Sequence, residues 1–364
     1  MKEDQNRRIQ TLKKSLSARG LDAALITGPE NRFYLSGFLA EDLGLTESAG
    51  ALIISKKQRF LLTDGRYEIQ AREQARGFTI VIYKRGLAHA LKDLFCSLGV
   101  KRCAFEPSFL SCSRFERLKK TLPNVSWHDL GDICKKMRQI KDPIEIEKLT
   151  KAQQVAEAVF QKVLPEIREG RTEKEIAFII LKGLYTLADG PSFPPIVASG
   201  ANSALPHAVP GDRKIRHGEP IIIDMGARLN GYCSDMTRTL FCSKPAEKFI
   251  RIYNTVKKAQ RAAQEAIRPG MTGREADDIA RRVIKEAGFG KYFVHSLGHG
   301  VGIAIHEAPA ISFRSRSRLK SGMVFTVEPG IYLPGEGGVR LENMGMLTEQ
   351  GLQIITSDKW IYDL

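Results

Sequence analysis

The stretch that decides the fold of the second half of the chain is 221-IIIDMGARLNGYCSDMTRTLF-241. Apolar residues alternate on both sides of Asn230-Gly231, a dipeptide typical of two-residue β-hairpin turns, because a type I′ turn needs φ > 0 at both central positions. The turn fixes the register of the two predicted strands. Three facing pairs follow from it: Leu229 with Tyr232, Gly226 with Asp235, and Asp224 with Thr237.

This register places two carboxylates on one face of the hairpin. Side chains alternate faces with period two, so Asp224 and Asp235 become diagonal neighbours, roughly 5–8 Å apart at their Cβ atoms. Gly226 leaves space beside them. Two such carboxylates repel each other unless a positive charge lies between them, and a divalent metal ion is the natural candidate. The plainer alternative is one solvated aspartate and one turn residue.

The composition is that of a globular protein with two domains. A chain of 364 residues is too long for one simple core, and 43% hydrophobic and 27% charged residues are ordinary values. No apolar run reaches the roughly 18 residues of a membrane span, and the start MKEDQNRRIQTLKK lacks the apolar segment of a signal peptide. The six cysteines show no C-x-x-C pair. We therefore expect free thiols and a cytoplasmic protein without a membrane partner.

The formal net charge of +15 raises the question of nucleic-acid binding. The basic residues are spread along the chain, with the densest runs at 135–138 and 314–320. Neither run is interleaved with stacking aromatic residues, and no helix-turn-helix pattern is present. We interpret the charge as a solvated basic surface and do not expect a nucleic-acid partner.

The first part of the chain, residues 1–141, alternates between strand and helix patterns. A mostly parallel sheet covered by helices is the expected α/β architecture. The expected strands are 23–27, 51–55, 59–62, 78–83 and 102–105, and the expected helices are 4–19, 67–76, 87–98 and 111–122.

The second part, residues 142–364, contains an internal repeat. The frame I-R-x-G-x-T-x-x-E occurs at 167–175 and again at 267–275, displaced by 100 residues. In each copy the glycine ends a long helix and T-x-x-E forms a capping box for the next one (173–188 and 274–287). Convergence on good capping chemistry is one explanation. Duplication is the other, and it predicts a pseudo-symmetric α+β domain whose ligand site lies between two similar halves.

The second half of this domain carries further charged residues in apolar surroundings. The run 295-HSLGHGVGIAIHE-307 contains three of the seven histidines, spaced among glycines. Glu328 follows an apolar strand, and Glu342 alternates with apolar residues beside Arg340. Each glutamate alone could be half of a buried ion pair with Arg340, and each histidine alone a hydrogen-bonded core residue. Together with the hairpin aspartates they suit two divalent ions.

These segments resemble the pita-bread-fold metallopeptidases, most closely the Xaa-Pro peptidase branch (aminopeptidase P and prolidase). The matching segments of the second domain are 192-SFPPIVASG-200 with 202-NSALPH-207, IIIDMGA, GYCSDMTRT, HSLGHGVG with HEAP, TVEPGIY and GVRLEN. The first domain contributes 31-NRFYLSGF-38 and 62-LTDGRY-67. The resemblance covers nearly the whole chain. It implies an α/β amino-terminal domain and a duplicated pita-bread catalytic domain.

The resemblance implies a dinuclear metal centre. Its five ligands would be Asp224, Asp235, His299, Glu328 and Glu342, with Asp235 and Glu342 bridging the ions. Two ions roughly 3.5–4 Å apart lower the pKa of a shared water and clamp the substrate carbonyl. The expected metal is Mn²⁺, with Co²⁺, Zn²⁺ or Fe²⁺ as substitutes.

The resemblance also implies roles in catalysis and substrate binding. Glu328 would accept the proton of the attacking water. His207 and His306 would bind the substrate carbonyl and stabilise the oxyanion, and His295 would line the proline pocket. Arg340 would lie near the bridging glutamate and the substrate terminus. Asn343 departs from the aspartate common in the family, which could alter metal affinity but removes no ligand.

We expect an Xaa-Pro aminopeptidase that releases the amino-terminal residue before proline. The alternatives are a prolidase restricted to dipeptides, a less selective aminopeptidase, and a non-catalytic peptide-binding module. The five ligand-type residues argue against the binding module and against metal-free relatives such as creatinase. The resemblance further implies a homodimer or homotetramer.

Overall fold

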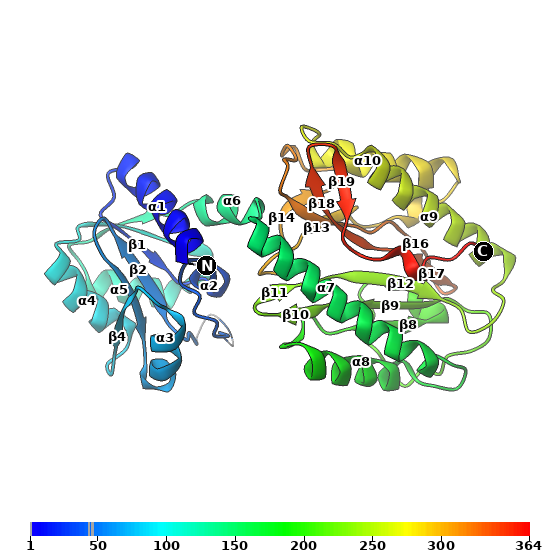
Figure 1. Ribbon diagram of the computed structural model, residues 1–364, viewed down its shortest axis with the longest axis horizontal. Coiled ribbons are helices and arrows are strands. Elements are labelled where there is room, and N and C mark those ends of the chain that lie inside the picture. The colour runs from blue at the N-terminus through cyan, green and yellow to red at the C-terminus, as the bar shows by residue number, and fades with distance from the viewer. Residues whose placement is uncertain (1, 43, 45–46) are drawn as a thin grey trace. The chain divides into compact units, whose positions relative to one another are not determined.

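The computed structural model describes residues 2–42, 44 and 47–364, and the chain divides into two compact units, Met1–Arg138 and Gln139–Leu364. The division lies three residues before the predicted boundary after Lys141. Figure 1 shows the elements of both units. Within the described residues, no helix combines the length and the apolar character needed to cross a membrane.

The first unit is built on a six-stranded sheet of order β4-β3-β2-β1-β5-β6. Strand β2 pairs antiparallel with β1 and β3, and the other pairs are parallel, as predicted. The strands are β1 (Ala23–Ile26), β2 (Ala51–Ser55), β3 (Arg59–Thr63), β4 (Thr79–Ile82), β5 (Arg102–Phe105) and β6 (Ser126–Asp129). The helices are α1 (Lys2–Ala18), α2 (Pro29–Ser36), α3 (Glu68–Gln74), α4 (Leu87–Leu98), α5 (Cys112–Thr121) and α6 (Ile133–Gln139).

The second unit places strands between two pairs of helices. Its helices are α7 (Pro143–Val163), α8 (Glu173–Leu187), α9 (Glu247–Ala266) and α10 (Gly273–Glu286). Helices α7 and α8 pack together on one side, and α9 and α10 on the other (Figure 1). Helix α7 gives way to a 3₁₀ turn at Leu164–Glu166, since Pro165 has no N–H to continue the helical bonding.

The strands of the second unit form four sheets. Their orders are β11-β10-β7, β12-β9-β8, β14-β13-β15-β18-β19 and β16-β17. The first eight strands are β7 (Gly190–Pro191), β8 (Ile196–Ser199), β9 (Ile221–Met225), β10 (Ala227–Leu229), β11 (Tyr232–Cys233), β12 (Met236–Leu240), β13 (Gly298–Gly300) and β14 (Glu307–Ile311). The remaining strands are β15 (Val324–Val327), β16 (Gly330–Leu333), β17 (Gly337–Arg340), β18 (Asn343–Thr348) and β19 (Gly351–Ile354).

The hairpin forms at the predicted turn. Asn230 and Gly231 have φ values of +50° and +77°, as a type I′ turn requires. Leu229 pairs with Tyr232 in β10–β11, and Asp224 pairs with Thr237 in β9–β12. The predicted pair Gly226–Asp235 lies at the break between these two sheets. A Cβ at Gly226 would lie 1.8 Å from the carbonyl oxygen of Ser234, so the space expected beside this glycine is filled by backbone. Asp224 lies in a fully buried strand.

The two copies of the repeat adopt the same local structure. Thr172 caps α8 and Thr272 caps α10, each in a reciprocal capping box with the glutamate three residues on. The likeness extends beyond the quoted frame, because Gly170 donates to Ile215 and Gly270 donates to Leu319 through equivalent backbone hydrogen bonds. These correspondences give the pseudo-symmetric domain that the repeat predicts.

Candidate active site

The expected ligand residues come from five different positions in the strands of the second unit. Asp224 lies on β9, Asp235 lies between β11 and β12, and His299 lies on β13. Glu328 follows β15, and Glu342 lies between β17 and β18. The hairpin belongs to the first half of the repeat and the other three positions to the second. The site is thus assembled where the two halves meet.

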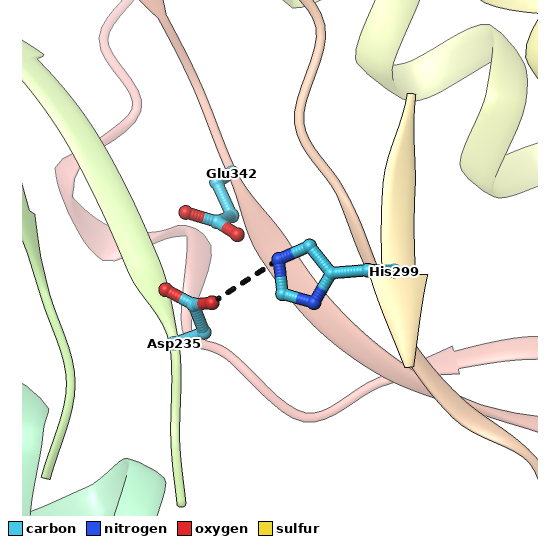
Figure 2. A group of neighbouring side chains, drawn as sticks. All are labelled: Asp235, His299 and Glu342. Carbon is cyan, nitrogen blue, oxygen red and sulfur yellow. Dashed lines mark ion pairs between the residues drawn. The ribbon is translucent and has the colours of Figure 1, made fainter. Parts of the chain in front are cut away.

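Three of these side chains converge directly, as Figure 2 shows. Asp235, His299 and Glu342 each offer a ligand atom within 4.8 Å of the others. His299 Nε2 lies 3.5 Å from Asp235 Oδ2 and 3.4 Å from Glu328 Oε1. Four of the five expected ligands therefore surround one space.

The imidazole of His299 is oriented to act as a ligand. Its Nδ1 lies 3.2 Å from the carbonyl oxygen of Gly300, which can only accept, so this nitrogen carries the proton. Burial lowers the pKa of His299 to about 4, with His306 contributing, and the ring is neutral near pH 7. The Nε2 lone pair then faces two carboxylates. A cation placed between these groups would make that arrangement favourable.

The carboxylates themselves form a repulsive cluster. Burial and then the neighbouring Glu342 raise the pKa of Asp235 well above its usual range. Burial and then Glu328 do the same to the pKa of Glu342. Burial raises the pKa of Glu328 to about 8. A protein keeps several acidic groups in such surroundings when bound cations neutralise them.

Asp224 differs from the other carboxylates because one oxygen has a protein cation. Its Oδ2 accepts a hydrogen bond of 2.7 Å from Arg340 Nη2. Its Oδ1 is buried and has no hydrogen-bond partner among the described residues. Burial raises the pKa of Asp224 despite the guanidinium. The orphaned oxygen and the neutral imidazole show that this donor set fits divalent metal ions.

Arg340 lies beside the carboxylates and bonds to several residues of the site. The plainer interpretation of Glu328 or Glu342 was an ion pair with Arg340, but Arg340 forms its ion pair with Asp224. Its guanidinium also donates to the carbonyl of Pro206 and the hydroxyl of Tyr332, at 3.2 Å and 3.0 Å.

The other three histidines of the predicted site occupy different environments. His295 is bonded on both ring nitrogens, to the carbonyl of Ser296 and to the hydroxyl of Tyr332, each at 2.8 Å. Burial lowers its pKa to about 4. His306 is exposed, and its ring centroid lies 4.3 Å from that of His299. His207 is also exposed, and it acts electrostatically on His306 and Asp224.

Sequence reasoning assigned no role to three residues that organise this site. Thr237 donates to Glu342 Oε2 at 2.7 Å and accepts from Arg340 Nε at 3.1 Å. Tyr332 joins His295 to Arg340. The motif TVEPGIY contains Tyr332, and the predicted register placed Thr237 opposite Asp224, so both signals were present in the sequence.

The third such residue is Arg238, which is fully buried. It donates to the backbone carbonyls of Thr237 and Glu342, at 2.9 Å and 2.6 Å, and to Asn343 Oδ1 at 3.0 Å. Asn343, the position that departs from the family pattern, in turn donates a hydrogen bond of 2.6 Å from its Nδ2 to Asp358 Oδ1. Arg238 thereby fixes the backbone on both sides of the carboxylate cluster.

The fold and this cluster are those of a metal-dependent peptidase. The family model described as metallopeptidase family M24 matches residues 147–349, and the creatinase/prolidase N-terminal domain matches residues 8–140. The chain belongs to metallopeptidase family M24. The expected family, the α/β plus pita-bread fold class and the expectation of a metal-dependent peptidase are confirmed.

Several relatives match over almost their whole length. An Xaa-Pro dipeptidase of Pyrococcus furiosus is 39% identical over 356 residues, covering 96% of this chain and 97% of that protein. The structure of an Xaa-Pro dipeptidase from Bacillus anthracis has a TM-score of 0.91 at 39% identity, covering 97% and 98% of the two chains. An X-Pro aminopeptidase structure from Thermotoga maritima has a TM-score of 0.89 at 37% identity, covering 96% and 97%.

Proposed function

We propose that this protein hydrolyses the bond between an amino-terminal residue and proline, with Xaa-Pro dipeptides as its main substrates. The single observation that carries the proposal is the cluster of buried carboxylates around the neutral His299. The names of the similar proteins favour the dipeptidase, which was the alternative in the sequence interpretation, over the aminopeptidase.

Two divalent ions are proposed as cofactors, held by Asp224, Asp235, His299, Glu328 and Glu342. When bound, they supply Lewis-acid chemistry, lowering the pKa of water and polarising the substrate carbonyl. Mn²⁺ is the proposed metal because four of the five donor residues offer oxygen, and Co²⁺, Zn²⁺ or Fe²⁺ would substitute.

Glu328 is the proposed proton acceptor. Its Oε1 accepts a hydrogen bond of 3.1 Å from the Thr326 hydroxyl, which fixes the carboxylate toward His299. The same oxygen lies 3.4 Å from His299 Nε2, so the carboxylate lies beside the histidine of the cluster. From this position it would take a proton from the attacking water and return it to the proline nitrogen, which becomes an amine as the bond breaks.

His207 and His306 are proposed to bind the substrate carbonyl. Both are exposed while the carboxylates beside them are buried, so they lie where a substrate can reach them. An N–H of each ring would donate to the carbonyl oxygen as negative charge develops there.

His295, Tyr332 and Arg340 form a fixed wall beside the site. The two ring nitrogens of His295 are already bonded within the protein, so this histidine offers its ring surface to a substrate. Proline has no amide N–H, so a site that holds the ring by contact suits it. The buried Arg340 guanidinium is proposed to attract the carboxylate at the end of a dipeptide.

The direct test compares Ala-Pro with Ala-Ala, using Mn²⁺-loaded protein and release of the free amino acids as the readout. We expect cleavage of Ala-Pro only, and we expect the Asp235→Asn variant to be inactive on both. Efficient release from Ala-Ala, or an intact Ala-Pro after loading with each of the four metals, would refute the proline assignment. A cytoplasmic location and a homodimer or homotetramer are proposed as well, the latter tested by light scattering.

A further inference from the structure

The first unit contains a basic cavity that the peptidase site does not use. Its volume is about 490 Å³, within the range of small-molecule sites. Its charged lining consists of four arginines and two carboxylates: Arg66, Arg85, Arg114, Arg117, Asp64 and Glu47. Positive charge is therefore in excess there.

The two carboxylates do not neutralise all four arginines. Asp64 accepts two hydrogen bonds from the guanidinium of Arg66, at 3.0 Å and 2.8 Å, and this contact lowers the pKa of Asp64. Among the described residues, Arg85 and Arg117 have no carboxylate oxygen within 4.0 Å. Both side chains are exposed, so their guanidinium donors can bind an anion that enters the cavity.

The cavity lies where the fold of the unit favours ligands. Strands β3 and β4 are parallel and end at Thr63 and Ile82, and the segments that follow these two ends line the cavity. In open α/β sheets, ligands bind outside the carboxyl ends of the strands. Helices α4 and α5, which pack together, provide the other walls.

The beginning of α4 adds to the attraction for an anion. Gly86 precedes the helix without a capping side chain, and the first turn has no acidic residue. The first residues of α4 line the cavity. The N-terminal end of the helix carries a partial positive charge, which adds to the attraction of the arginines for an anion. The arginines remain the main source of positive charge.

The lining also includes an apolar part, made of Leu87, Ala88, Leu110 and Leu118. A cavity of this volume is larger than a bare inorganic anion needs. Arginine forks bind the oxygens of a doubly charged phosphate better than those of a single carboxylate, because more oxygens can be shared.

We propose that this cavity binds a small phosphomonoester, with its phosphate among Arg85, Arg114 and Arg117 and its apolar body against the leucines. The site is separate from the peptidase chemistry and does not depend on the proposed function. It gives part of the net charge of +15 a specific role.

Phenyl phosphate is the probe, titrated calorimetrically into full-length Mn²⁺-loaded protein at about 0.15 M salt, where exposed charges are largely screened. The test variant is Arg85→Ala/Arg117→Ala. The matched control is Lys92→Ala/Lys120→Ala, which removes two exposed charges from α4 and α5 outside the cavity.

We expect saturable one-to-one binding by the parent protein and the lysine control, and at least about tenfold weaker binding by the arginine variant. All three proteins should cleave Ala-Pro equally. Phenyl phosphate that failed to saturate the parent protein, or that bound the arginine variant as tightly, would overturn the proposal. Binding at the metal centre would give the second result, together with inhibition of peptidase activity.

Discussion

The substitution Glu328→Gln should make the metal-free protein more stable while removing its peptidase activity. Burial raises the pKa of Glu328 from its ordinary value of 4.5 to about 8. In the metal-free fold at pH 7 the carboxyl is therefore protonated, whereas in the unfolded chain it is ionised. A glutamine resembles the protonated carboxyl in the folded state. Because it cannot ionise, its unfolded state is not stabilised by loss of a proton at pH 7.

The magnitude follows from this shift. At pH 7 the unfolded group lies 2.5 pH units above its ordinary pKa of 4.5, and the folded group lies below its pKa of about 8. At 1.36 kcal/mol per pH unit, ionisation of this carboxyl on unfolding lowers the free energy of unfolding of the wild type by up to about 3 kcal/mol. The variant cannot ionise and is more stable by that amount. The gain is an upper value, because 16% of the side chain is exposed to solvent.

The sign is checked by pH. When the pKa of an acid is higher in the folded state, the acid does not lower the free energy of unfolding at a pH below its unfolded pKa. It lowers that free energy progressively as the pH rises from about 4.5 toward 8. The difference between variant and wild type should thus shrink to below about 1 kcal/mol at pH 5.

The assay is urea unfolding of EDTA-treated proteins at pH 5 and pH 7. Glu286→Gln is the control, because Glu286 is exposed on α10, and it should change stability by less than about 0.5 kcal/mol. The prediction would be refuted by a Glu328→Gln protein that is less stable than wild type at pH 7. It would also be refuted by a stability difference that is the same at pH 5 and pH 7.

Three further outcomes are expected. Arg340→Met should cost about 3–5 kcal/mol in urea unfolding, because it leaves the buried Asp224 without its cation, and a loss below about 1 kcal/mol would contradict the assigned ion pair. Asp235→Asn and Glu342→Gln should each lower the metal content found by elemental analysis and abolish Ala-Pro cleavage; full metal content in either variant would exclude a bridging role. Chelation should abolish activity and Mn²⁺ should restore it, with a rise in Tm that is absent when metal-free buffer alone is added.

Local patterns predicted much of the fold. The turn at Asn230-Gly231 is encoded by two adjacent residues, and each capping box by residues three apart, so both could be inferred without knowledge of the rest of the chain. The five proposed ligand positions followed from motifs in order along the sequence. Their metal-binding roles and the domain boundary after Lys141 stay predictions.

The elements that were missed carry weak local signals. Helix α2 begins at Pro29 in a polar segment, strand β6 has the sequence SWHD, and helix α6 is only seven residues long. None contains a full period of apolar residues, so each depends on contacts with distant parts of the first unit. Sequence periodicity cannot report such contacts.

The same limit applies to the polar network of the site. Arg340 binds Asp224, 116 residues away, and not the neighbouring glutamates. Arg238 reaches Glu342 across 104 residues. These partners depend on which strands adjoin in the folded domain, and a charge flanked by apolar residues shows only that some partner is needed.

The most direct test of the proposed function is the release of amino acids from Ala-Pro and from Ala-Pro-Ala by Mn²⁺-loaded protein, with its metal content measured on the same sample. We expect about two ions per chain, rapid release of proline from Ala-Pro and little release of alanine from Ala-Pro-Ala. Efficient cleavage of the tripeptide would restore the aminopeptidase interpretation. Two bound ions with neither peptide cleaved would contradict Xaa-Pro hydrolysis itself.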